Sequence, residues 1–139
     1  MKPKALLRIA GILMLLHAVG HTIGAITWKK APNATVQQVV DGMQSNHFDF
    51  MGRSISLGLF FDGYGFIMIG VFLLLTMLLW QLAAEPNSKI MAMLSSFLLF
   101  MGICELIWFF PFAAAFSLLA GIITLFSYFQ TKQLWRRSN

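Results

Sequence analysis

Two histidines, His17 and His21, lie one helical turn apart inside an apolar run of residues 5–27. A run of this length can cross a bilayer, and ionisable side chains are costly at membrane depth, so they default to functional residues there. Two carboxylates, Asp62 and Glu105, stand in later apolar runs. An imidazole beside a carboxylate can exchange a proton with it, and burial favours the neutral form of the acid. These four side chains are therefore the candidate catalytic residues.

The same side chains have the composition of a metal site. His17 and His21, at i and i+4 of a helix, can present two nitrogens to one ion. Asp62 and Glu105 would complete a two-histidine, carboxylate set suited to zinc or iron. One histidine could instead be an axial ligand of haem, although two on one helix cannot hold a haem from opposite faces. The sequence leaves open whether there is no cofactor or a single metal such as zinc or iron.

Four further residues are candidates for substrate binding, namely Arg53, Tyr64, Trp108 and Ser117. Arg53 precedes the second apolar run, where it would anchor that run at the headgroups, pair with Asp49 or hold an anionic substrate group. Tyr64 follows Asp62 in an Asp-Gly-Tyr-Gly motif, and it points away from Asp62 on an ideal helix. Ser117 lies on the small and polar face of the last run.

The elements that must position these residues are membrane-spanning helices. The chain is 58% apolar and only 11% charged, with a mean hydropathy of +0.76, which is far outside the composition of a soluble domain. All 139 residues are expected to form one all-α domain, an antiparallel bundle of four transmembrane helices. Cys104 is the only cysteine, so neither an intrachain disulfide nor a cysteine zinc site is available. The spans are predicted at about 5–27, 53–80, 88–110 and 112–132.

The outer loop, residues 28–52, is expected to contain one short helix. Asn33 or Thr35 can cap it. Apolar residues then recur at helical spacing, at Val36, Val39, Val40 and Met43. That face predicts an interfacial helix that lies on the membrane or folds over the bundle as a lid.

The four ionisable residues fall at similar depths when the spans are laid antiparallel. From the outer end of each span, His21 and Glu105 lie about seven and about five residues in, at about 1.5 Å per residue. His17 lies about eleven residues in and Asp62 about nine. On each of these spans, small and polar residues lie on the same helical face as the ionisable residue, as close packing of transmembrane helices requires. The sequence therefore predicts one polar pocket in the outer half of the bundle.

The distribution of basic residues predicts the topology. Seven of the ten Lys and Arg residues fall on the side of the two termini, and Lys29, Lys30 and Arg53 fall on the other. Both termini are thus expected in the cytoplasm. The net charge of +5 follows from this clustering at span ends, which favours lipid headgroups over nucleic acid. The N-terminal run lacks a signal-peptidase site of the A-x-A kind, so we expect it to remain as the first span.

Three short motifs resemble those of a family of small bacterial membrane proteins with four spans and no known activity. They are Gly20-His21-Thr22 with Gly24, Phe50-Met51-Gly52-Arg53-Ser54, and Asp62-Gly63-Tyr64-Gly65. This resemblance implies a bacterial inner membrane. The architecture is also similar to the sterol isomerase superfamily, whose acidic and histidine spacings differ, so no residue role is carried over from it.

These observations favour a lipid-embedded enzyme of the isomerase or cyclase type. It would act by acid–base chemistry on a hydrophobic substrate such as an isoprenoid, a sterol-like molecule or a quinone. One alternative is a metal- or haem-binding redox protein that uses His17 and His21. Another is a structural or accessory membrane subunit, in which the polar network fixes the packing of the helices or relays protons. Membrane lipids and a lipophilic small molecule are the expected partners, and a homo-oligomer is left open.

Overall fold

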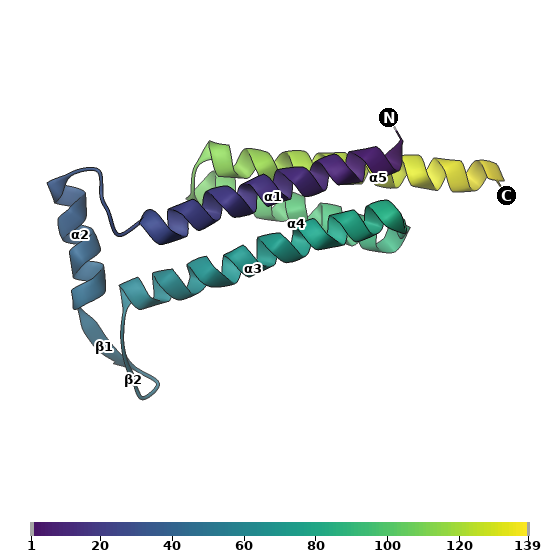
Figure 1. The fold of residues 1–139 in the computed structure, drawn as a ribbon. Helices are drawn as coiled ribbons and strands as arrows, with labels where there is room; N and C mark the ends of the chain where they lie inside the picture. The colour runs from purple at the N-terminus through teal and green to yellow at the C-terminus, as the bar shows by residue number, and fades with distance from the viewer. Residues whose placement is uncertain (1, 139) are drawn as a thin grey trace. The chain divides into compact units, whose positions relative to one another are not determined.

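The computed structural model describes residues 2–138, with the backbone alone from 135 onward. Within this range the chain forms five helices and one β-hairpin (Figure 1). In order they are α1 (Pro3–Thr27), α2 (Ala34–Ser45), β1 (His47–Phe50), β2 (Arg53–Ser56), α3 (Leu57–Ala84), α4 (Ser88–Trp108) and α5 (Pro111–Ser138). By length and composition α1, α3, α4 and residues 111–134 of α5 can each cross a membrane. The prediction of a helical chain with four candidate spans is confirmed.

Two span boundaries differ from the sequence prediction. The second span was expected from about Arg53, but α3 begins at Leu57, because residues 53–56 pair with β1 instead. The side chain of Ser56 then accepts a hydrogen bond from the backbone N–H of Leu59, which satisfies one free donor of the new helix. α3 also ends later than expected, at Ala84 rather than at about Trp80. The last helix begins with Pro111, whose fixed φ suits the first position of a helix, and its candidate span covers residues 111–134.

The hairpin was not predicted. Its register pairs His47 with Ser56 and Phe50 with Arg53. Met51 and Gly52 form the two-residue turn with φ of 51° and 80°, and positive φ at both central residues matches the right-handed twist of the flanking strands. Alternation of polar and aromatic residues in His47–Phe50 is the local signal for the first strand.

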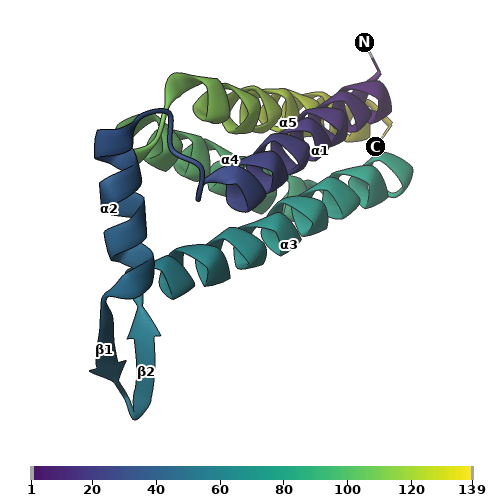
Figure 2. The same ribbon diagram turned by 60° about the vertical axis from the view of Figure 1, so that its left-hand side comes forward.

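The chain divides into two compact units. The first contains residues 1–18 of the N-terminal segment and 72–139, and thus most of α1, the second half of α3, and all of α4 and α5. The second unit is Val19–Val71, with the end of α1, α2, the hairpin and the first half of α3. Figure 2 shows these elements from a second direction.

The first unit has a close antiparallel pair of helices, α4 and α5. Gly102 on α4 faces Leu118 so closely that a Cβ there would lie 2.9 Å from the Leu118 backbone nitrogen. Gly121 on α5 faces Leu99 in the same way, with 3.0 Å from its Cβ position to the Leu99 nitrogen. Small residues thus let the two backbones approach, as in other membrane helix pairs.

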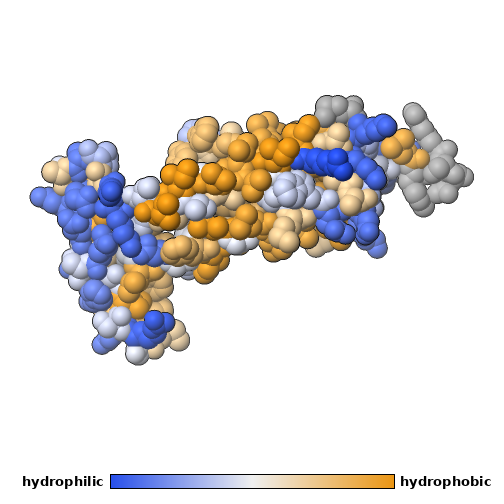
Figure 3. Space-filling view, viewed as in Figure 1, coloured by the Kyte–Doolittle hydropathy of each residue, from blue (hydrophilic) through white to orange (hydrophobic). Residues whose placement is uncertain are grey.

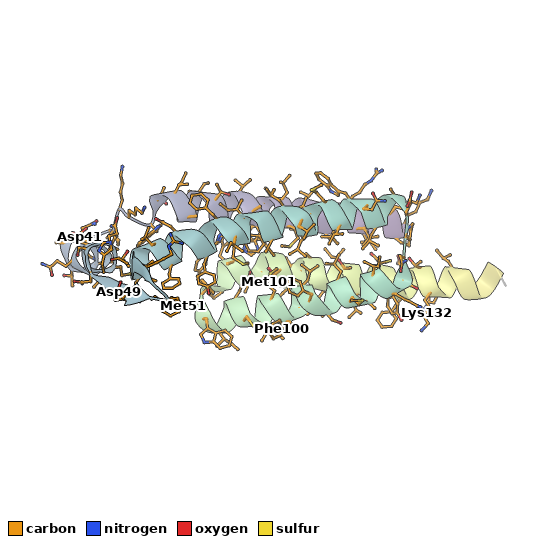
Figure 4. All side chains as sticks on the ribbon, turned by 90° about the horizontal axis from the view of Figure 1, so that it is seen from below. Asp41, Asp49, Met51, Phe100, Met101 and Lys132 are labelled. Carbon is orange, nitrogen blue, oxygen red and sulfur yellow. The ribbon has the colours of Figure 1, made fainter. Side chains whose placement is uncertain are left out.

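The interior of this unit mixes large apolar side chains with hydroxyl groups. The hydroxyls of Thr76, Ser95, Thr124 and Ser127 each donate to a carbonyl of their own helix, three or four residues earlier. The outward faces are apolar (Figure 3), and Figure 4 shows Phe100 turned outward beside the buried Met101. Exposed apolar side chains along helices of this length are expected where lipid is the solvent.

In the second unit the short helix α2 packs beside the start of α3. Asn33 caps α2 by accepting from the backbone N–H of Val36, and the helix expected between the first two spans is confirmed. Gly58 of α3 lies against α2, where a Cβ would come within 3.1 Å of the Met43 carbonyl oxygen.

Candidate functional site

His17 is the centre of a buried polar cluster in the first unit. Its Nδ1 is 3.2 Å from the hydroxyl oxygen of Ser117, within hydrogen-bonding distance. Its Nε2 is 3.6 Å from Oε1 of Glu105, a distance that allows an ion pair. The imidazole therefore stands between a hydroxyl group and a carboxyl group that come from two other helices.

Three helices position this cluster. His17 lies on the same buried face of α1 as Ala10 and Met14, at helical spacing. Glu105 is one turn beyond Gly102 on α4, and Ser117 precedes Leu118 on α5, so the close contact of Gly102 with Leu118 also sets the spacing of the two polar groups. Ser117 is completely buried, and His17 and Glu105 are 6% and 8% exposed.

Two aromatic rings flank the imidazole. Phe72 stacks on His17 with 4.2 Å between ring centroids, and Phe116 lies tilted to it at 5.7 Å. These two rings give the imidazole an aromatic environment on the sides where they lie.

Ser117 differs from the other buried hydroxyls of this unit. Thr76, Ser95, Thr124 and Ser127 bond to their own helices, which is the usual arrangement for Ser and Thr in apolar helices. The Ser117 hydroxyl instead meets a ring nitrogen of another helix. Because a hydroxyl group can donate to Nδ1 or accept from it, this contact holds the orientation of the His17 ring in either tautomer.

Glu105 has one oxygen without a hydrogen-bond partner among the residues that the structure describes. This atom, Oε2, is buried, while Oε1 is the atom nearest His17. An unpaired polar atom in an apolar interior is costly and calls for a specific explanation.

The cluster lies close to an exposed aromatic turn. Trp108 ends α4 one turn after Glu105, and Phe109, Phe110 and Phe112 follow it, all of them more than half exposed. Aromatic side chains gather where a span meets the membrane interface. Trp108, proposed from the sequence as a substrate-binding residue, is 71% exposed and contributes to this turn.

Asp62 belongs to the second unit and has two partners there. Its carboxylate accepts from the indole N–H of Trp28 at 2.8 Å and pairs with the Lys29 ammonium at 2.7 Å. Both partners follow directly after α1, where the sequence placed them at the outer interface. The Lys29 side chain is about half exposed, so solvent screens the pair and its contribution to stability is modest, within the range of about 0–1 kcal/mol.

The remaining sequence candidates also belong to the second unit. His21 Nε2 lies 3.0 Å from the backbone carbonyl oxygen of Gly65 on α3. Tyr64 is 67% exposed, and Arg53 is an exposed residue of β2 opposite Phe50. The candidates that meet within one unit are thus His17, Glu105 and Ser117.

The metal site stays a prediction from the sequence. In the described part of the chain no three histidine, cysteine, aspartate or glutamate side chains gather in a group that could hold an ion. His17 and Glu105 alone supply two ligand atoms, whereas zinc and iron sites with protein ligands use three or more.

Sequence reasoning missed four partners of the site residues. Phe72 and Phe116 flank His17, and among fourteen phenylalanines nothing local distinguishes these two. Trp28 and Lys29 were placed at the interface, and the signal that they bind a carboxylate was their position directly after α1, opposite the first turns of the next span.

Comparisons with protein-family models, curated proteins and solved structures found no match to this chain.

Proposed function

We propose that this multi-pass membrane protein is an enzyme that moves a proton on a hydrophobic substrate, with Glu105 and His17 as the acid–base pair. The observation that carries the proposal is the buried contact between His17 and Glu105, with the second Glu105 oxygen unpaired. General acid–base catalysis needs two groups that can exchange a proton and a third that fixes their orientation. Ser117 is the positioning residue, because its hydroxyl group holds the imidazole of His17 in place.

The pair supports a complete cycle for moving a carbon–carbon double bond. The starting state has a neutral Glu105 and a His17 that carries its proton on Nδ1, donated to Ser117. Glu105 Oε2–H gives its proton to one alkene carbon, forming a C–H bond, and His17 Nε2 removes a proton from a neighbouring carbon, breaking one. The proton on Nε2 then returns to Glu105 at Oε1, 3.6 Å away, and a half-turn of the carboxyl group about its Cγ–Cδ bond restores the protonated oxygen to the substrate side. No oxidant or cofactor is needed for this isomerisation.

The surroundings suit an apolar substrate. The cluster lies in helices whose outward faces are apolar, and the rings of Phe72 and Phe116 stand beside the imidazole. A cationic intermediate on the substrate would be stabilised by such ring faces. We therefore assign the substrate to unsaturated lipids such as isoprenoids, sterol-like molecules or quinones.

Deuterium uptake tests this proposal even while the substrate is unidentified. Membranes from cells that produce the chain are incubated in D2O, and the extracted neutral lipids are examined by mass spectrometry. We expect one lipid class to gain carbon-bound deuterium, and Glu105→Gln and His17→Asn to slow this uptake by about 100-fold or more, the usual contribution of a general acid or base.

Glu85→Gln is the matched control, because Glu85 lies at the exposed end of α3 and should leave the uptake unchanged. Deuterium uptake equal in the Glu105→Gln and wild-type membranes, or no uptake that depends on the protein, contradicts the proposal. The structural-subunit alternative would then be favoured.

A second candidate function is acyl transfer, which the short contact between the Ser117 hydroxyl and His17 favours. With the opposite tautomer, Ser117 donates its proton to Nδ1 and its oxygen can attack an ester carbonyl, in the order hydroxyl, imidazole and carboxylate known from hydrolases. A fluorophosphonate probe separates the two functions. Labelling that is lost in Ser117→Ala but kept in Ser95→Ala would favour acyl transfer, since Ser95 is an equally buried hydroxyl bonded to its own helix.

We further propose that the protein resides in a bacterial inner membrane with both termini in the cytoplasm and α2 at the outer interface. Support comes from the distribution of basic residues and from the apolar positions of α2. In a Cys104→Ser background, Asp49→Cys in the outer loop should react with an impermeant maleimide added to intact cells. Asn87→Cys, between α3 and α4, should react only after permeabilisation. The reverse pattern would show that the orientation is inverted.

A further inference from the structure

We infer that the hairpin His47–Ser56 binds the membrane surface, with its apolar face in the interfacial region of the bilayer beside the start of α3. This inference goes beyond the proposed function, since none of its residues belongs to the His17 cluster. It is carried by the two faces of the hairpin, by its direct junction with a membrane span and by the geometry of its turn.

The hairpin has one apolar and one polar face. Paired residues of an antiparallel hairpin point to the same side, and the side alternates along each strand. One face therefore carries Phe48, Phe50 and Ile55 together with Arg53. The opposite face carries His47, Asp49, Ser54 and Ser56. Phe48 and Phe50 remain 41% and 50% exposed, so the unit itself covers only part of this apolar face.

The apolar face is fixed at the level where α3 begins. Strand β2 ends at Ser56 and α3 starts at Leu57, with no linker between them. Phe60, in the first turn of α3, contacts both aromatic residues of β1, with ring centroids 6.4 Å from Phe48 and 5.7 Å from Phe50. Because α3 is a candidate span, its first turn marks the membrane boundary and the face of the hairpin lies there too.

The hairpin also has the orientation that this contact requires. Within the second unit it runs across the direction of α3 in both ribbon views, so it can lie along a membrane surface that α3 enters (Figures 1 and 2). Figure 4 labels Asp49 and Met51 at the hairpin, with Met51 further along the direction in which α3 runs. Figure 3 shows mainly hydrophobic residues on the side of the hairpin toward which α3 runs and hydrophilic residues on the other.

The turn places a large apolar side chain where small polar residues are usual. Met51 has a φ of 51° and is 91% exposed. Asn, Asp and Gly are preferred at such positions, and a methionine in this region is uncommon. A strained backbone that holds an apolar side chain outward is explained when that side chain has an apolar environment to enter.

Lipid is the contact partner that fits these features of the hairpin. Arg53 stands on the apolar face beside Phe50, so a cation accompanies the aromatic rings. Aromatic residues with a neighbouring arginine are typical of segments at the headgroup and acyl boundary, where the cation meets lipid phosphates. A hairpin joined without a linker to a span is also held at that boundary by the span itself.

Depth measurements on reconstituted protein test the inference. The chain, in a Cys104→Ala background, is placed in vesicles of phosphatidylcholine and phosphatidylglycerol with an environment-sensitive fluorophore on Met51→Cys or Asp49→Cys. We expect nitroxide lipids to quench the Met51 probe at least about threefold more than the Asp49 probe, and iodide in the water to show the reverse order. Asp49 is the matched control, two residues away on the polar face.

Equal quenching at the two positions would overturn the inference. Protection of the Met51 probe from both lipid and aqueous quenchers would also overturn it, because a protein surface, such as a second copy, would then cover the turn. A second readout avoids the fluorophore. Unlabelled Met51→Cys should react with a water-soluble maleimide several-fold more slowly in vesicles than in detergent, whereas Asp49→Cys should react equally in both.

Discussion

Replacing His17 with alanine is expected to lower the free energy of unfolding by about 1–3 kcal/mol through its polar contacts alone, because it leaves the buried carboxyl group of Glu105 without its partner. The loss of the stacked ring beside Phe72 adds a cavity to this cost. Ser117→Ala removes one neutral hydrogen bond only, and such bonds between membrane helices are worth about 0.6 kcal/mol on average. The two variants should therefore differ several-fold in effect.

A double-mutant cycle separates the pair from simple loss of packing. His17→Leu and Glu105→Met are expected to be destabilising singly, while the double variant should recover most of the loss, because two apolar groups replace both members of a buried pair. Stability is measured by thermal unfolding in one mild detergent, followed by size-exclusion chromatography. Additive losses would mean that the two side chains do not interact, and the proposed acid–base pair would lose its geometric basis.

Adding a methyl group at the α4–α5 contact is the second change with a large expected effect. Gly102→Ala and Gly121→Ala each place a Cβ within about 3 Å of a backbone nitrogen on the facing helix, which cannot move like a side chain. Each is expected to cost about 1–3 kcal/mol, the range for overpacking. Thermal unfolding in detergent again provides the measurement.

Gly70→Ala is the control for this prediction, because nothing lies within 4 Å of its Cβ position. It should leave stability unchanged or raise it by up to about 1 kcal/mol, the gain in helix propensity of alanine over glycine. Gly102→Ala should also reduce deuterium uptake, since separation of α4 and α5 moves Glu105 away from Ser117. If Gly102→Ala were as harmless as Gly70→Ala, the close approach of the two helices would be wrong.

Hydropathy and periodicity were sufficient for most of the fold. Four long apolar runs predict four spans because a helix needs about 20 apolar residues to cross a bilayer. The spacing from Val36 to Met43 likewise predicted α2. The hairpin was missed because its strands have four residues each. So short an alternation of polar and apolar residues next to a long apolar run does not distinguish a strand from a loop. The presence of the hairpin also moved the start of α3 to Leu57.

The residues of the candidate site could be predicted from the sequence, but the contacts between them could not. His17 and Glu105 were identified because ionisable groups are rare in spans. Substrate binding by Ser117 stays a prediction. Its contact with His17 was not predicted, because which of several interior hydroxyl groups makes it depends on how α5 is rotated. Asp62 was grouped with the histidines as a candidate catalytic residue, and Trp28 and Lys29 bind its carboxylate. The position of these two residues directly after α1 was the available signal for that contact.

The hydroxyls that bond to their own helices have a consequence for how a large apolar molecule would enter. Thr76, Ser95, Thr124 and Ser127 satisfy their donors within one helix, so parting two helices there breaks none of these hydrogen bonds. Separation along such a seam loses only van der Waals contacts, which the tail of an entering lipid replaces. A bundle with such an interior would need no permanent opening for an apolar substrate, because the substrate could enter laterally from the membrane between two helices.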